Sequence, residues 1–572
     1  MISDERVLAS WLAARDDDAL AATLSARSVA RTVPWQDFFD AAEGLLDPTS
    51  IERALRRRSR TELAALLGGG DARTVDRLRA SALVRDDGTP YTAVSAVVDA
   101  LRGADPQAFE RVDTSTAPRT ADPKAAAAAA ERVFAASGSL TDVLLETLAA
   151  PLARTGVGSV SAADRKRLIE GGAVADGDEL DDQLAAALAA GLARAGAHEW
   201  LVTPAADDWL ELSTPDRWAV VVCGIRSVLP AGLRTPDGGY LAIALWRAAY
   251  PLDPAWPDTA EALQRLAHRW GLSGDTDDEE PEWATPLRLG SDADTASLSR
   301  MLPAEIDRLY LQADLSAIAP GPLAPALDLR LRRIARRESR AQASTYRFTA
   351  DSLASGVTEG ETAESIRAFL GRLSLTGIPQ PLDYLIQTTA ARHGLVEVTT
   401  DAATGRTRVS SSDRDLLRAI EVDQALRALG LLVDGDVLTT RVARDAVYWS
   451  LADARYPVVA HNGAGEPEAL HRRVADADDP ATDSPGAYGA LIAAWRAGHG
   501  VDGEDAWLER ELDQAVRAKA VIIVVVRMPD GTERSFTLEA SGLGGGRLRG
   551  RDRGADIERT LPVSSIIRVQ SA

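Results

Sequence analysis

The stretch from Arg308 to Arg340, RLYLQADLSAIAPGPLAPALDLRLRRIARRESR, decides the fold, because its hydrophobic periodicity changes in the middle. From Leu309 to Ala319, apolar and polar side chains alternate, which predicts a half-buried strand. The following Pro320-Gly321-Pro322 predicts a turn. From Leu327 to Arg340 the spacing becomes helical and arginine is frequent. We therefore expect a strand, a turn and an arginine-dense helix in this order.

Apolar residues at helical spacing continue on the C-terminal side of this stretch. The first stripe has the positions i, i+3, i+4 and i+7 and consists of Ile366, Phe369, Leu370 and Leu373. The second stripe consists of Leu382, Leu385 and Ile386. Pro381 precedes the second stripe, and proline is favoured in the first turn of a helix. The pattern predicts two short helices that pack side by side.

This region resembles a known family. The resemblance rests on YLQADL, APGPL, ESRAQA, YRFTADSL and IPQPL, all within residues 300 to 395, and more weakly on the upstream SWLAARDDDAL and WLVTPAADDWLELSTPDRWA. These motifs resemble bacterial helicase-associated domain proteins, whose N-terminal domain is related to that of XPB-type DNA helicases. The resemblance implies a role linked to DNA, beside a helicase motor, with an XPB-type helicase as the partner.

Length and charge limit the possible functions. A chain of 572 residues is too long for one core and predicts three to four domains. Apolar residues make up 45% and charged residues 26% of the chain, as is usual for globular proteins. The formal charge of −21 disfavours nonspecific adhesion of the whole molecule to DNA or to anionic membranes. Any surface that binds nucleic acid must therefore be a local basic island.

Cysteine content and the N-terminal sequence point to the cytoplasm. Cys223 is the only cysteine, which excludes an intrachain disulfide and a cysteine-based zinc or iron–sulfur site. MISDERVLASWLAARDDD has no secretory signal pattern, and no apolar run approaches the roughly 20 residues of a membrane span. We expect a cytoplasmic protein without a metal or cofactor.

The sequence predicts a mainly helical, multi-domain α+β protein. Shifts in composition mark the boundaries between its domains. The acidic run SGDTDDEEPEW and the segment VADADDPATDSPGAYG are the two predicted linkers. The predicted units are a helical or winged-helix-like domain at 1–120, a second one at 121–272, an acidic linker at 273–298, a central XPB N-terminal-like α/β domain at 299–473, a linker at 474–488, and a C-terminal helix with a small β-barrel-like domain at 489–572.

The first unit contains a possible helix-turn-helix. Ser59 to Glu62 fits a capping box, Gly68 to Gly70 a turn, and Asp71 to Leu83 a second helix, followed by RDDGTPYTAV as a possible wing. On that second helix, the residues that would reach phosphates or base edges are Arg73, Arg77 and Arg79. An ordinary helical hairpin with a solvated arginine face explains the same pattern, and the sequence leaves both interpretations open.

The second unit repeats the order helix, helix and short strand, which favours another winged-helix-like module. Trp200, Trp209 and Trp218 recur at intervals of nine residues. Such a series fits either a stacking platform for single strands or core packing. We favour core packing, because the residues between the tryptophans are acidic rather than basic.

The C-terminal tail changes character. AVIIVVVRMPDGTERSFTLEA predicts two strands about the turn at Asp530-Gly531, and the tail as a whole has a small β-barrel pattern. The tail resembles a degenerate C-terminal portion of the WYL family, echoed in Arg559-Thr560-Leu561, although the aromatic-rich signature of that family is missing. The tail is also the clearest basic island. Its candidate phosphate-binding residues, which alternate and would share one face of a strand, are Arg547, Arg549, Arg551 and Arg553. A hairpin whose arginines face only water explains the same alternation, and the sequence leaves both interpretations open.

Catalytic motifs are missing from the sequence. A helicase motor needs GxxxxGK followed by serine or threonine, and none of Lys124, Lys166 and Lys519 stands in that context. The sequence also has no GxSxG elbow and no HExxH motif. We predict no catalytic residues and a protein that is not itself a helicase.

Three functional hypotheses follow. The first is a noncatalytic DNA-binding or helicase-associated accessory protein in DNA repair or other DNA transactions. The second is a WYL-like transcriptional regulator whose tail senses a ligand. The third is a protein-interaction scaffold without affinity for nucleic acid, for which the negative charge is no handicap.

Overall fold

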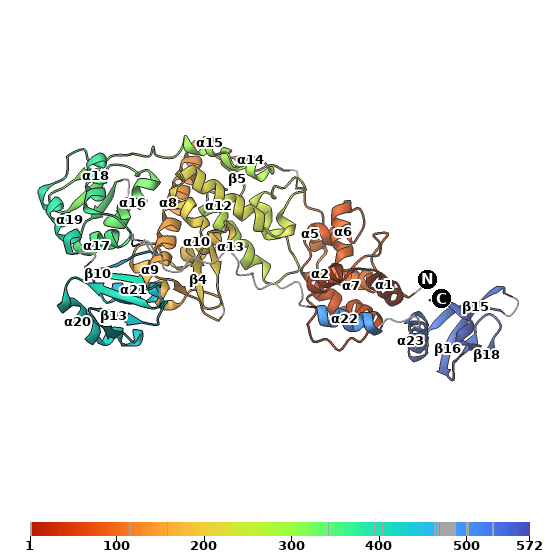
Figure 1. The fold of residues 1–572 in the computed structure, drawn as a ribbon. Coiled ribbons are helices and arrows are strands. Elements are labelled where there is room, and N and C mark those ends of the chain that lie inside the picture. The colour runs from red at the N-terminus through yellow and green to blue at the C-terminus, as the bar shows by residue number, and fades with distance from the viewer. Residues whose placement is uncertain are drawn as a thin grey trace.

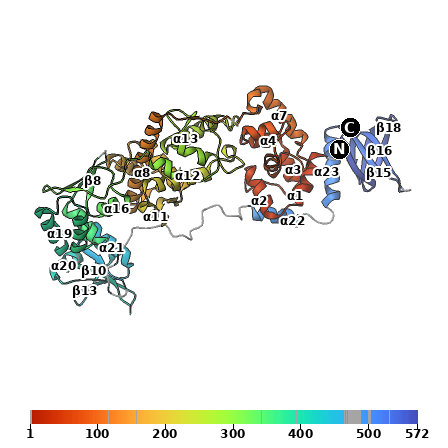
Figure 2. The ribbon, with the colours of Figure 1, turned by 90° about the horizontal axis from the view of Figure 1, so that it is seen from above.

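The computed structural model describes residues 3–114, 116–156, 158–340, 343–392, 395–402, 404–462, 465, 468, 488–498, 503–528 and 531–571. Helices and several small sheets alternate in space, so the mixed α+β class is confirmed. The chain is elongated, with the N-terminal helices and the C-terminal sheet at one end and residues 300–460 at the other (Figures 1 and 2). The predicted linker at 474–488 lies outside the described residues, apart from its last residue.

The N-terminal unit is a helical bundle around one apolar core. Its elements are α1 (Asp4–Ala13), α2 (Asp17–Ala26), α3 (Phe38–Leu46), α4 (Pro48–Arg56), α5 (Arg60–Ala65), α6 (Ala72–Ala80), α7 (Thr92–Ala104) and the 3₁₀ turn η1 (Pro106–Phe109). Helix α22 (Gly489–Gly498) joins this core from far along the sequence, as Figure 1 shows. Its Trp495 is fully buried and donates its indole N–H to the Trp35 carbonyl at 3.1 Å.

The predicted helix pair of this unit is confirmed as α5 and α6. The Ser59 hydroxyl accepts from the Glu62 backbone, and the Glu62 carboxylate accepts from the Ser59 backbone, which completes the capping box. The Asp71 carboxylate caps α6. A tight hairpin follows, in which the Arg85 N–H donates to the Thr89 carbonyl at 2.7 Å. The assignment of this arrangement as a winged helix stays a prediction.

The second unit combines a helical core with a small antiparallel sheet. Its elements are β1 (Arg119–Thr120), α8 (Pro123–Ala149), β2 (Leu152–Ala153), α9 (Ala162–Glu170), α10 (Gly177–Ala189), β3 (Ala193–Ala195), β4 (Glu199–Val202), α11 (Ala205–Glu211), α12 (Thr214–Val228), η2 (Ala231–Leu233), η3 (Ile243–Ala248), α13 (Trp256–Arg269), β5 (Glu279–Glu280), η4 (Glu282–Ala284), α14 (Thr285–Arg288) and α15 (Thr295–Ser299). The sheet order is β2-β4-β3. Three of the last four elements lie within the segment predicted as an acidic linker, and α15 extends one residue beyond it. In this segment, Trp283, Leu287 and Leu298 are buried in the unit's core.

The three regularly spaced tryptophans of this unit are core residues. Trp200, Trp209 and Trp218 are 7%, 1% and 0% exposed, which excludes a surface stacking platform. The indole of Trp218 donates to the Trp270 carbonyl at 2.8 Å, so its polar atom is satisfied inside the core. The interpretation as core packing is confirmed.

Residues 306–392 form a third core with a four-stranded sheet in the order β6-β7-β9-β8. Its elements are β6 (Tyr310–Leu311), β7 (Ser316–Ala319), α16 (Pro325–Ile334), β8 (Arg336–Arg340), β9 (Ser344–Arg347), α17 (Ala350–Thr358), α18 (Ala363–Leu373) and α19 (Gln380–Arg392). The two helices predicted from the apolar stripes are therefore confirmed as α18 and α19.

Two local predictions in this core were wrong. The expected single strand from Leu309 to Ala319 is a hairpin, because the backbone at Leu315 turns into the left-handed region with φ 68° and the Asp314 carboxylate accepts from the Ser316 N–H. The expected helix to Arg340 ends at Ile334, because Arg336–Arg340 pair with β9 as an edge strand.

Residues 396–460 form a fourth core around a second sheet, in the order β12-β13-β11-β10-β14. Its elements are β10 (Val396–Thr400), β11 (Thr407–Ser411), α20 (Arg414–Val422), η5 (Gln424–Leu429), β12 (Leu432–Asp434), β13 (Val437–Thr440), α21 (Arg444–Asp453) and β14 (Val458–Ala460).

The tail is an open sheet rather than a closed barrel. Helix α23 (Gly503–Arg517) precedes strands β15 (Val521–Arg527), β16 (Glu533–Gly544), β17 (Arg547–Asp552), β18 (Ile557–Pro562), the turn η6 (Val563–Ser565) and strand β19 (Ile566–Ser571). The strand order β18-β17-β16-β15-β19 leaves β18 and β19 as unpaired edges. One face of the sheet packs against α23, so burial is achieved without closure. The WYL-like assignment stays a prediction.

None of the helices in the described ranges combines the length and the apolar composition that a bilayer crossing requires.

Candidate nucleic-acid interface

The three candidate arginines of α6 have different hydrogen-bond and ion-pair partners within the protein. Arg73 is exposed but donates to the Pro236 carbonyl of the second unit at 2.8 Å. Arg77 pairs with the capping carboxylate of Glu62 at 3.1 Å. Arg79 pairs with the Asp76 carboxylate and donates to a backbone carbonyl of the hairpin at 3.0 Å. The side chains that were expected to reach DNA are therefore engaged within the protein.

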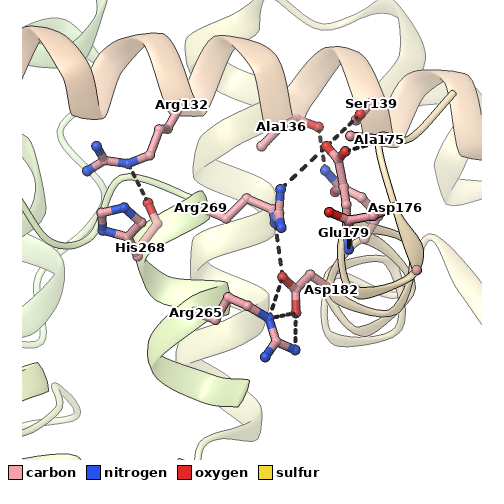
Figure 3. Close-up of polar contacts among 12 residues, drawn as sticks. Arg132, Ala136, Ser139, Ala175, Asp176, Glu179, Asp182, Arg265, His268 and Arg269 are labelled. Atoms are coloured by element: carbon pink, nitrogen blue, oxygen red, sulfur yellow. Dashed lines mark hydrogen bonds and ion pairs between the residues drawn. The ribbon is translucent and has the colours of Figure 1, made fainter. Parts of the chain in front are cut away.

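Helix α10, which follows α9 in the second unit, presents acids rather than bases. Its Asp182 is 3% exposed and receives a bidentate contact from Arg265, with a closest N–O distance of 3.1 Å (Figure 3). Arg269 approaches the same carboxylate at 3.0 Å and Glu179 at 3.4 Å. Hydrogen bonding to Asp182 raises the pKa of Arg265 above its ordinary value.

This network holds α13 against α10. In Figure 3, Arg265 and Arg269 reach from α13 toward the acids of α10, and Arg132 of α8 donates to the His268 carbonyl beside them. The His268 imidazole is half-buried, and burial and the nearby Arg132 charge lower its pKa. The face of α10 that carries Asp182 is thus covered by α13 of the same chain.

The arginine-dense segment of α16 and β8 is used for packing between units. Arg332 and Arg337 both pair with Asp142, a residue of α8 that is 4% exposed, and the Arg332 distance is 2.7 Å. Arg330 makes a bidentate pair with Glu361 at 2.8 and 2.9 Å. Most of the positive charge that stands out in the sequence is therefore neutralised. These ion pairs join α8 to α16 and β8.

A cleft of about 1870 Å³ lies beside this junction. Its walls come from α8, α9 and α11 of the second unit, from α16, β8, α17 and α19 of the third core, and from α21 of the fourth. Acidic side chains outnumber basic ones in its lining. Asp207 and Glu211 of α11 are exposed on its wall. The sequence did not indicate this site, because its residues come from segments as far apart as Asp142 and Pro457 and share no motif.

Most of the arginine row in the tail lies on one face of a strand, as the alternating sequence predicted. In β17, residues alternate between exposed and buried, so Arg547, Arg549 and Arg551 share the exposed face. Arg553 follows the end of the strand and lies in the next turn. The buried positions of β17 include Leu548, which belongs to the core under α23.

Ion pairs divide this row in two. Arg551 pairs with Asp556 at 2.8 Å, and Arg553 pairs with Glu539 at 2.9 Å. Within the described ranges, Arg547 and Arg549 have no ion pair. Their neighbours across the sheet are Gly544 and Gly542 on one side and Pro562 and Thr560 on the other. This end of the strand therefore offers two unneutralised guanidinium groups on an open face.

A fixed carboxylate supports this strand from the buried side. Asp552 accepts from the Arg559 guanidinium at 2.6 Å and from the Gly554 backbone at 2.9 Å. Both contacts favour the charged form, and the Arg559 hydrogen bond is the main reason that the pKa of Asp552 lies below its ordinary value. Arg559 also stacks over the Phe536 ring at 4.6 Å. The turn after β17 is thereby held in place.

Comparison with known proteins adds one finding. Residues 309–433 match the family described as helicase conserved C-terminal domain. The match covers the third core and most of the fourth, up to strand β12. No curated protein matches the chain. In this segment the chain is similar to a domain of helicases, which indicates a helicase-associated or nucleic-acid-related role.

Proposed function

We propose that this protein is a noncatalytic accessory factor of DNA transactions such as repair, which binds DNA and acts beside an XPB-type helicase. The observation that carries the proposal is the match of residues 309–433 to a helicase domain family. The absence of GxxxxGK with serine or threonine from the sequence supports a role without ATP hydrolysis by this chain.

The proposed DNA contact in the tail is the exposed end of β17. Arg547 and Arg549 project from a supported strand and have no carboxylate partner among the described residues. Guanidinium groups in this position pair readily with backbone phosphates, since they keep their charge and offer several donors. Such contacts position the protein on DNA without reading its sequence.

The tail itself supplies the variants for a test. Arg547→Ala/Arg549→Ala removes the two unpaired arginines, and Arg551→Ala/Arg553→Ala removes the same charge from two ion-paired positions. Binding to a fluorescent duplex is measured by anisotropy at several salt concentrations. We expect the first variant to weaken binding about tenfold at low salt and to reduce the salt slope by about 2, because each phosphate contact contributes about 0.9.

The paired-position variant is expected to retain most of the affinity, because Asp556 and Glu539 already neutralise its arginines. Equal losses in both variants contradict the assignment of the contact to the exposed end of β17. ATP turnover by the purified chain, with or without DNA, contradicts the noncatalytic part of the proposal.

The cleft favours a second candidate function, a scaffold that binds a protein partner. Its volume of about 1870 Å³ exceeds the roughly 300–1,000 Å³ of small-molecule pockets, and its acidic excess disfavours phosphate groups. The test compares Glu211→Lys, on the cleft wall, with Asp208→Lys, an exposed position of the same helix outside the lining. Loss of binding to an XPB-type helicase in the first variant alone supports the scaffold, and equal binding by both contradicts it.

A further inference from the structure

The last turn of α4 and the residue after it carry three arginines on one side of the N-terminal unit. Arg53, Arg56 and Arg57 stand at i, i+3 and i+4, so they are neighbours on the helix surface. All three are exposed. They lie in the arginine-rich sequence RALRRRSR, which begins at Arg53. Positive charge near a helix C-terminus is also favoured by the helix dipole.

Little negative charge neutralises this group. Arg56 pairs with Glu52 at 2.6 Å, within the same helix. Arg57 donates to the Ser28 hydroxyl, a neutral acceptor. In the part of the chain that the structure describes, Arg53 has neither a hydrogen bond nor an ion pair. One carboxylate therefore faces three guanidinium groups, in a protein whose formal charge is −21.

A fourth guanidinium lies beneath the surface group. Arg27 is 2% exposed and donates to the Ser50 hydroxyl of α4 at 3.0 Å. Its other bonds go to the backbone carbonyls of Leu45, Ser81 and Ala82, all of them neutral acceptors. Burial, and after it the charges of Arg58 and Arg53, lower the pKa of Arg27 to about 10, which still leaves it charged at pH 7. The buried Arg27 therefore adds a fourth positive charge beneath the three exposed arginines.

The contrast with α6 strengthens the case. There, Arg77 and Arg79 pair with carboxylates and Arg73 is bound to the second unit. On α4, Arg53, Arg56 and Arg57 are all exposed, and of the three only Arg56 pairs with a carboxylate among the described residues. A cluster of this kind suits an extended polyanion better than a single small anion, because the three groups are spread over a helical turn.

We propose that Arg53, Arg56 and Arg57 form a second phosphate-binding surface, which contacts the DNA backbone. The inference rests on the proposed function, since it presumes that the protein binds DNA. It adds that the N-terminal unit engages DNA through α4 and not through α6. Each of the three contacts releases about one counterion from duplex DNA.

The test uses the full-length protein, a fluorescent 30-base-pair duplex and a salt series. The triple variant Arg53→Ala/Arg56→Ala/Arg57→Ala is compared with Arg102→Ala/Arg247→Ala/Arg300→Ala, which removes the same charge from three exposed arginines on separate elements. We expect the α4 variant to bind at least tenfold more weakly at low salt, with a salt slope smaller by about 2 to 3. The control variant should change affinity less than threefold.

A single substitution distinguishes loss of DNA binding from loss of folding. Arg53→Glu removes no contact among the described residues, so it should preserve the thermal unfolding curve and still weaken DNA binding several-fold. Equal affinity of the α4 and control variants, with wild-type binding intact, overturns the α4 surface alone. A wild-type protein that binds no DNA overturns the proposed function. Tighter binding to phosphatidylserine vesicles than to DNA, lost in the α4 variant, overturns the nucleic-acid assignment.

Discussion

Substitution of Asp182 by asparagine is predicted to weaken the core of the second unit. Asp182 is 3% exposed and holds Arg265 and Arg269 of α13 through N–O contacts of 3.0 to 3.2 Å. Removing one partner of a buried ion pair costs about 3–5 kcal/mol. The two arginine side chains are 38% and 25% exposed, so water partly replaces the lost acceptor. We therefore expect a loss of about 2–3 kcal/mol.

Tryptophan fluorescence during urea unfolding is a suitable assay. Half of the 12 tryptophans in the chain lie in this core, so the signal includes a large contribution from it: they are Trp209, Trp218, Trp246, Trp256, Trp270 and Trp283. With a slope of about 2–3 kcal/mol/M, the midpoint should fall by about 1 M urea.

The matched control is the neighbouring residue of the same helix. Asp181→Asn makes the same chemical change at a carboxylate that is 52% exposed and pairs with Arg165 at 2.8 Å. A surface pair contributes at most about 1 kcal/mol, so the midpoint should move little. If the two variants unfold at the same urea concentration, the network between α10 and α13 does not hold these helices together, and the reasoning is refuted.

Three further predictions concern other parts of the chain. Trp495→Ala should destabilise the N-terminal core by about 3–5 kcal/mol in thermal unfolding, because it removes a buried indole. The control Ala494→Ser changes an exposed neighbour and should leave Tm unchanged. An unchanged Tm in Trp495→Ala means that α22 is not part of this core. Gly239→Ala should lower Tm, because its Cβ would overlap a backbone carbonyl oxygen, while Gly103→Ala has open space in a helix and should add about 0.5–1 kcal/mol. The pKa of Asp552 is lowered in the folded protein, so the stabilisation from its carboxylate is complete above the unfolded pKa of 3.8 and is lost as pH falls through the lower folded pKa. The Tm difference between wild type and Asp552→Asn should therefore be larger at pH 7 than at pH 2. A Tm difference that does not change with pH contradicts this role of Asp552.

Local elements were predictable from sequence where one periodicity governs a whole segment. The stripes of α18 and α19 and the strands about Asp530-Gly531 needed only spacing and turn chemistry. Prediction failed where tertiary context overrides the pattern. The residues Arg336–Arg340 are good helix formers, yet they pair with β9 as a strand. The tail has enough strands for a barrel, but α23 covers the sheet and closure is not needed.

The candidate site was predictable only in part. The alternation at 547–551 correctly placed three arginines on one face of β17. Which of them are free depends on Asp556 and Glu539, and no pattern in the sequence indicates these pairs. Likewise, Arg332 of α16 pairs with Asp142 of α8, which stands 190 residues earlier, and no pattern in the sequence indicates this pair. Ion pairing between distant segments is decided by packing, which a single sequence does not reveal.

Direct DNA binding is the central claim, and anisotropy of the full-length wild-type protein with fluorescent single- and double-stranded DNA across a salt series tests it most directly. We predict submicromolar affinity at low salt that falls steeply as salt rises, because the contacts are arginine–phosphate pairs. No binding of either DNA at low salt, or an affinity that is independent of salt, contradicts the account.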